Sequence, residues 1–330
     1  MAALILRRLG ATLVLLFVVS LLIFAGCEIL PGDVAQVALG QFATEENVQA
    51  LRVQMGLDRP APVRYLEWLA GVVQGDWGTS IVTRNSVSSM LSERIANTAM
   101  LAGLTTIIAV PLAILLGLAM AMRRGSTVDR ATSVVILGLS ATPEFLIATL
   151  GVLLFAVHLG WLPAVAYLSP GADIADTLRA LLLPTLTLVI VVTAQISRMT
   201  RAIIANILNE PYIEMAALKG IPHHRVVAYH ALLNAIGPIA NVVALNVAYL
   251  VSGIVVVETV FAYPGLAQLM IDAVQSRDMP VIQACAMIFC ATYVLLVLLA
   301  DIIAQACDPR AKAAGRAVAQ TGLSNPAEAQ

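Results

Sequence analysis

Long stretches without ionisable side chains constrain this chain more than any other feature. No Asp, Glu, Lys or Arg occurs from Ile95 to Met122, from Val226 to Val257 or from Met279 to Ala300. Three further stretches, near the N-terminus, around 131–172 and over 180–197, carry one such charge or none. A helix needs about 20 apolar residues to cross a bilayer. The sequence therefore predicts six spanning helices, at about 9–30, 97–122, 133–158, 180–202, 236–260 and 281–304.

The third of these stretches leaves an alternative open. A re-entrant segment fits within about 131–172, and Pro143 allows a kink there. Composition agrees with a membrane class, because 60% of the residues are hydrophobic and 12% are charged, against about 25% charged in soluble domains. A net charge of −1 gives no electrostatic footprint for nucleic acid. An all-α membrane protein is predicted, and a disordered tail protein, a disulfide scaffold and a basic nucleic-acid binder are excluded.

The orientation follows from the distribution of arginine and lysine. Twelve of these residues lie on the side of the two termini and seven on the opposite side, five of the seven in one long loop. Because cytoplasmic loops carry the excess of positive charge, both termini are predicted to be cytoplasmic.

The N-terminus has two interpretations. Arg7 and Arg8, an apolar run and the segment from Phe24 to Cys27 resemble a lipoprotein signal. We favour an uncleaved first helix, because the apolar run is long and five spans follow. The other cysteines are Cys285, Cys290 and Cys307, with no C-x-x-C pair, so neither a zinc site nor a disulfide framework is indicated.

The predicted outer loop, 31–95, has the pattern of a structured segment. One helix is expected to follow Thr44 and to end near Gly56, and a second to start at Pro62 and to end at Gly75. This loop could be a lid or a docking platform, or it could merely cover the bundle.

The predicted inner loop, 203–235, is the most informative stretch. Asn209 can cap a helix whose early positions include Pro211, and Gly220 can stop it in a left-handed conformation. The small pair Ala216 and Ala217 would leave one face low enough to enter a groove on another protein. An ordinary connecting helix is the alternative.

Residues in this loop carry a resemblance to a known family. Glu214, Ala216 and Gly220 match the E-A-A-x3-G pattern of ABC importer permeases, with Met215 at the first alanine. An ordered set of further segments resembles the dipeptide/oligopeptide/nickel branch of that family. These segments are Leu30–Asp33, Gly56–Pro60, Val63–Tyr65, Gly75–Gly78, Leu159–Pro163, His230–Leu232 with Asn234–Ala235, Val257–Leu266, Arg277–Asp278 and Asp308–Arg310.

The resemblance covers residues 1–312, a permease domain that includes the outer loop 31–95 and the coupling loop 203–235. The remaining residues, 313–330, read as a flexible tail. Two positions depart from the wider pattern, because His230 and Leu233 stand where the family has an apolar residue and a proline, and Pro238 follows later. The entry into the fifth span can therefore differ from the family's.

The resemblance implies a role within a complex of the bacterial inner membrane. Glu214, Ala216, Ala217 and Gly220 would belong to a coupling helix that docks on an ATPase subunit. The partners would be a second homologous permease, two ATP-binding cassette ATPases, an extracytoplasmic binding protein and membrane lipid. Substrates would be peptides or similar small solutes, moved by alternating access. ATP would bind to the partner ATPases, so no cofactor is expected on this chain.

Few residues suggest chemistry of their own. The sequence has no G-x-x-x-x-G-K-[ST] and no H-E-x-x-H, so ATP hydrolysis and zinc-protease chemistry are not expected. His223 and His224 are expected to be exposed polar residues. Glu144 and Glu258 lie within predicted spans, where charges usually face the bundle interior or water; both are candidates for a translocation path. Glu258 could instead anchor the outer loop.

Two other functions remain possible on sequence alone. An ion-coupled secondary transporter would show inverted repeats and several charges at the membrane midplane, and no clear repeat is present. A non-transporting membrane scaffold would not need a capped inner helix.

Overall fold

A computed structural model describes residues 2–29, 36, 43–54, 56–167, 171, 173–222 and 225–307. Those residues form helices and turns, with one isolated antiparallel bridge between Thr79 and Ser86. The expectations for Leu30–Asp33, His223, His224, Asp308–Arg310 and the tail 313–330 lie outside the described residues. The helices are α1 (Ala2–Ile29), α3 (Glu45–Gln54), α4 (Ala61–Gln74), α5 (Val87–Met122), α6 (Thr127–Ala141), α7 (Glu144–Gly151), η2 (Val152–His158), α8 (Ile174–Ile207), α9 (Pro211–Leu218), η3 (Val226–Ala231), α11 (Leu232–Val260), α12 (Leu266–Ser276) and α13 (Met279–Cys307).

Five of these helices are long and apolar enough to cross a membrane. They are α1, α5, α8, α11 and α13, and they match five of the six predicted spans. The third predicted span, 133–158, is broken, as the alternative of a kink at Pro143 or a re-entrant segment allowed. It consists of α6 followed by α7 and η2, and the two parts are bent by 100°.

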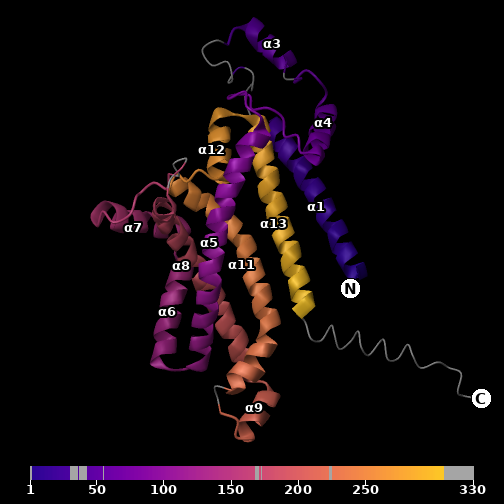
Figure 1. The fold of residues 1–330 in the computed structure, drawn as a ribbon. Coiled ribbons are helices and arrows are strands. Elements are labelled where there is room, and N and C mark those ends of the chain that lie inside the picture. Colours follow the sequence, from indigo (N-terminus) through magenta and orange to yellow (C-terminus); the bar gives the residue numbers. More distant parts are fainter. Residues whose placement is uncertain are drawn as a thin grey trace, which may run out of the picture.

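Pro143 explains the break in the third span. Proline has no N–H to donate within a helix, and it forces the preceding residue out of the helical region. Thr142 has an extended conformation (φ −82°, ψ 127°) and ends α6, while Pro143 precedes the first turn of α7. In Figure 1, α6 runs alongside α5 and α8, whereas α7 turns away to the side of the bundle.

Helix α8 is the centre of the bundle. In its most apolar window 78% of the residues are buried, against at most 33% in the other four spanning helices. It packs against α5, α6, α7 and α11. Gly117 allows the close approach of α5, because a Cβ atom there would lie 2.7 Å from the carbonyl oxygen of Ser197. The shortest uncharged stretch of the sequence is thus covered by protein.

The bundle has two differently built ends (Figure 1). At the first, α4 packs on α1 and α12 packs on α5, α11 and α13; we call it the α12 end. At the second lie the turn between α5 and α6, the end of α8, α9 and η3; we call it the α9 end. The structure has two helices, α3 and α4, in the loop where two were expected, and Gly75 ends α4 with φ +79°.

Candidate coupling and translocation sites

Helix α9 begins at the proline that the sequence suggested. The carbonyl oxygen of Glu210 accepts bonds from the backbone N–H groups of Ile213 (2.9 Å) and Glu214 (3.3 Å), and Pro211, which has no N–H, occupies the first position. The prediction that Asn209 caps α9 is wrong. Its side-chain oxygen instead accepts a hydrogen bond of 3.1 Å from Arg124, in the turn between α5 and α6.

The end of α9 is confirmed as a left-handed stop at Gly220. This residue has φ +77°, and the N–H of Ile221 donates back to the carbonyl oxygen of Ala216 over 3.3 Å. That bond is the outer hydrogen bond of a Schellman motif, and Ile221 packs against the cluster that contains Ala216, which is the hydrophobic contact that often accompanies the motif. The chain therefore reverses at Gly220 in one defined conformation.

The two faces of α9 differ from the prediction. Ile213 and Ala216, three residues apart, pack against Val226 and Ala231 of η3. Ala216 is only 7% exposed, so the expectation that it opens onto another protein is wrong: this face meets its own chain. Ala217 lies in α9, and its side chain is outside the described part.

The exposed face of α9 carries a different set of residues. Tyr212, Met215 and Leu218 recur every three residues and are exposed, with Leu218 at 78%. Glu214 is also exposed, beside Met215. Sequence reasoning considered only the small residues of this helix and missed the apolar stripe, although its spacing of i, i+3, i+6 is visible in the sequence.

An ion pair with a buried carboxylate links the elements at the α9 end. Two nitrogens of Arg201 in α8 donate to the two carboxylate oxygens of Asp129 in α6, each over 2.7 Å. Asp129 also accepts from the N–H of Gly125 (3.0 Å), and Ser126 caps α6 through the N–H of Asp129 (3.1 Å). Together with the Arg124–Asn209 bond, these contacts join α5, α6 and α8 to the segment that enters α9.

The signal for this pair was present in the sequence. Ser126-x-x-Asp129 has the spacing of a capping box, whereas Arg124 and Arg201 were counted only among the twelve basic residues that indicate the orientation. Helix α9 is further tied to α11, because Asn234 donates to the hydroxyl of Tyr212 over 3.2 Å.

At the α12 end, Glu258 is a fully buried anchor. Its carboxylate accepts bonds from the hydroxyl of Thr98 in α5 (2.6 Å) and from the N–H groups of Ala267 (2.8 Å) and Gln268 (3.3 Å) in α12. A carboxylate at a helix N-terminus satisfies free N–H groups and interacts favourably with the helix dipole. These contacts attach Glu258 to α5 and α12 rather than to the outer loop 31–95, and a place for Glu258 in a translocation path stays a prediction.

The segment Val257–Leu266 forms the end of α11 and a turn that hydrogen bonds to α5 hold in place. The hydroxyl of Tyr263 donates to the carbonyl of Asn97 (2.7 Å), and the Asn97 amide donates to the carbonyl of Pro264 (2.8 Å). Burial raises the pKa of the Tyr263 phenol, so it stays a donor. Gly265 faces the Glu258 carboxylate, which occupies the space of a Cβ atom. Sequence reasoning recognised this segment but did not predict α12.

Asp278 holds the loop before α5 against the start of α13. It is buried, and it accepts hydrogen bonds from the hydroxyl of Ser80 and from the N–H of Ile81 (3.1 Å). This contact joins parts of the chain that are almost two hundred positions apart, so the loop at the α12 end has a fixed place on the bundle.

Glu144 lies at the start of α7, half-buried. Its carboxylate lies beside Gly253 of α11, where a Cβ atom would come within 2.8 Å of it. Glu144 therefore contacts α11 at Gly253, five residues before Glu258. The two carboxylates do not share their neighbours.

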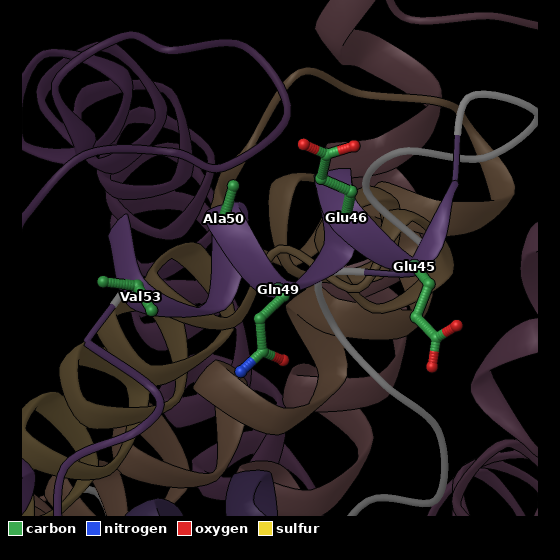
Figure 2. Close-up of a pocket in the computed structure, with 5 residues that line it drawn as sticks. All are labelled: Glu45, Glu46, Gln49, Ala50 and Val53. Carbon is green, nitrogen blue, oxygen red and sulfur yellow. The ribbon is translucent and has the colours of Figure 1, made fainter.

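The first turns of α3 also carry carboxylates, but they do not form a site. Glu45, Glu46, Gln49, Ala50 and Val53 line a hollow on this helix. Figure 2 shows the two carboxylates pointing in different directions, and all five residues come from α3 itself. Among the described residues, no group of three His, Cys, Asp or Glu side chains could hold a metal ion.

Comparison with known proteins relates most of the chain to a family of transport proteins. Residues 113–313 match the model of the binding-protein-dependent transport system inner membrane component, and residues 1–102 match the model of its N-terminal part. A probable peptide ABC transporter permease of Sinorhizobium fredii is 37% identical over 310 residues, which cover 94% of this chain and 99% of the relative. A putative peptide permease of Brucella suis is 37% identical over 313 residues (93% and 98%). The glutathione transport system permease protein of Escherichia coli is 34% identical over 305 residues (92% and 97%).

Proposed function

The chain belongs to the family of binding-protein-dependent transport system inner membrane components, and from this membership we propose that it forms half of a translocation path for peptides. It is a permease subunit of an ABC importer, as its relatives are. Permease subunits of this kind are not enzymes, and ATP hydrolysis takes place in partner subunits. The secondary transporter and the scaffold are thereby set aside.

The substrate class rests on the relatives over nearly their full length. Two of them are named as peptide permeases and one as a glutathione permease, and glutathione is itself a tripeptide. Short peptides share a polar backbone with charged ends, so their path needs polar or ionisable groups at membrane depth. Glu144, which is half-buried beside α11, is our candidate for a contact with the substrate; Glu258 is a second candidate, next to the α12 end.

The complex that we propose contains this chain, a second homologous permease, two ATPase subunits and an extracytoplasmic binding protein in the inner membrane. The α9 end would face the cytoplasm, because the turn between α5 and α6 and the end of α8 carry Arg123, Arg124, Arg130, Arg198 and Arg201, in line with the positive-inside rule. Both termini would then be cytoplasmic. ATP would be held by the ATPases, and we propose no cofactor on this chain.

Coupling is assigned to α9 on the strength of its two faces. Ile213 and Ala216 attach it to η3, and the exposed stripe Tyr212, Met215 and Leu218 is free to enter an apolar groove on an ATPase. Gly220 fixes the direction of the helix. Movement of the ATPases would reach the bundle through η3 and α11 on one side and through Arg124, Asp129 and Arg201 on the other.

Reconstitution tests the proposed function. The chain is placed in proteoliposomes with its second permease, the two ATPases and the binding protein, and uptake of labelled di- and tripeptides is measured with ATP and with a non-hydrolysable analogue. Uptake is expected only with ATP and only with the binding protein. Uptake driven by an ion gradient without ATP would contradict the assignment, and ATP-driven uptake of another solute class without any peptide uptake would contradict the substrate.

A matched pair of variants tests the role of α9. Leu218→Asp places a charge on its exposed stripe, and Val73→Asp places the same charge on α4 at the other end, where Val73 is 81% exposed. Leu218→Asp is expected to reduce co-purification of the ATPases, whereas Val73→Asp leaves it unchanged. Equal co-purification of the two variants would show that α9 is not the docking helix.

A further inference from the structure

A cleft between α1 and α13 joins a positively charged mouth to apolar walls. It has a volume of about 470 Å³, and Figure 1 shows the two helices side by side. Arg7, Arg8 and Asp301 stand at its mouth. The walls below the mouth include Ala11, Leu15, Val294, Val297 and Leu298.

The mouth carries one positive charge that no carboxylate among the described residues neutralises. Arg8 forms an ion pair with Asp301, so the negative charge of Asp301 is neutralised by Arg8. Within the described part of the chain, no carboxylate pairs with Arg7. Since the apolar span of α1 begins at Leu6, Arg7 lies at the membrane boundary, where lipid headgroups are.

The cleft continues along the membrane-spanning parts of both helices. The lining residues of α1 run from Arg7 to Leu15, and those of α13 run from Asp301 back to Tyr293. Eight residues of helix correspond to roughly 12 Å, most of the ~15 Å that the hydrocarbon of one leaflet occupies. The walls are therefore long enough to hold much of one acyl chain.

We propose that this cleft is a binding site for an anionic phospholipid. The headgroup phosphate would accept hydrogen bonds from the Arg7 guanidinium, which can donate two parallel N–H groups to phosphate oxygens, and one acyl chain would lie along Leu15, Val294 and Val297. Basic residues beside spanning helices attract anionic headgroups. A free phosphate would leave the apolar walls uncovered, and a zwitterionic phospholipid would bring an ammonium group whose positive charge offsets its phosphate beside Arg7 and Arg8. The inference goes beyond the proposed transport function and depends on neither the substrate nor α9.

Photo-crosslinking tests the site in the assembled complex. The complex is placed in phosphatidylcholine nanodiscs that contain a small fraction of phosphatidylglycerol with a diazirine in its acyl chain, and labelled peptides are mapped after irradiation. Labels are expected in 11–15 and 294–298. Unlabelled phosphatidylglycerol should compete, whereas added phosphatidylcholine of the same chain length and glycerol 3-phosphate should not.

Two variants with matched controls test the contact with the lipid headgroup and the contact with its acyl chain separately. Arg7→Gln is expected to lower labelling about five-fold, the factor that corresponds to the ~1 kcal/mol of one basic residue near an anionic surface. Arg130→Gln removes an exposed arginine from α6 and should change nothing. Val297→Trp fills the cleft and should abolish labelling, while Leu295→Trp, at an exposed position of α13 that does not line the cleft, should retain it.

Several results would overturn the proposal. Equal competition by phosphatidylcholine would make the cleft a general apolar groove, and competition by glycerol 3-phosphate would make it a site for small anions. Two further results would refute the proposal. One is wild-type labelling that falls only outside these two peptides, and the other is labelling that Arg7→Gln leaves unchanged. The competition arm uses the wild-type complex, so it decides the matter even where a variant fails to assemble.

Discussion

Replacing Gly220 with valine disfavours the left-handed backbone conformation that ends α9 and removes no side-chain contact. Gly220 has φ +77°, and a Cβ atom added there would meet nothing within 4 Å. The Cβ atom therefore causes no steric overlap, and backbone strain is the expected effect of the substitution. An L-residue in the left-handed region costs roughly 1–2 kcal/mol, and a β-branched residue lies at the upper end of that range. A change of this size shifts a local equilibrium by a factor of roughly 5–30.

Asparagine supplies the matched control at the same position. It tolerates the left-handed conformation much better than valine does, so Gly220→Asn is expected to stay close to wild type. In Gly220→Val, the N–H of Ile221 should lose its bond to Ala216 and exchange faster with deuterium.

The functional consequence is measured on reconstituted complexes. Gly220→Val is expected to reduce substrate-stimulated ATPase activity and peptide uptake, because α9 would no longer point in one direction, while the spanning helices stay inserted. If the valine and asparagine variants have the same amide exchange and the same stimulation, the left-handed stop does not set the position of α9, and the reasoning is refuted.

Three further predictions concern orientation, path and stability. In a cysteine-free background, a membrane-impermeant thiol reagent on intact cells should label Gln49→Cys and miss Lys219→Cys; labelling of the second alone would reverse the orientation. Glu144→Gln should lower peptide uptake or shift substrate preference while the complex still assembles, because charges at membrane depth usually face the interior; unaltered kinetics across several peptides would remove Glu144 from the path. Asp129→Asn should destabilise the complex by about 1.5–3 kcal/mol, the range for hydrogen bonds to charged groups, and an unchanged thermal midpoint would contradict the importance of its pair with Arg201.

The sequence predicted the spanning helices well because the bilayer imposes a simple requirement on composition. Charge-free stretches located α11 and α13 within about four residues and the end of α5, whereas α5 begins ten residues before its predicted start, because its first turns carry Glu93 and Arg94. In the third span, Pro143 marked the place of the break, but composition cannot tell a bend of 100° from a mild kink, so the size of the bend was not predictable.

The candidate sites were harder to predict, because they depend on which elements meet. The position of α9 and its stop at Gly220 followed from local rules, but its faces did not. Ala216 is covered by η3, and no local rule states that the chain after Gly220 folds back on α9. The surroundings of Glu258 were equally unpredictable. Its position within a span could be read from the sequence, but its hydrogen-bond donors come from α5 and from α12, a helix that was not predicted from the sequence.

The central place of α8 has a consequence for the biosynthesis of this chain. Its buried side includes the hydroxyl-bearing residues Thr185, Thr187, Thr193, Ser197 and Thr200. Helices α5 and α6 are made before α8 and can cover part of this surface at once. Helix α11 leaves the ribosome later, so α8 enters the bilayer with one side still open to lipid. The membrane machinery has to shelter that side until the following segment arrives, and the slowest stage of assembly is expected at this point of synthesis.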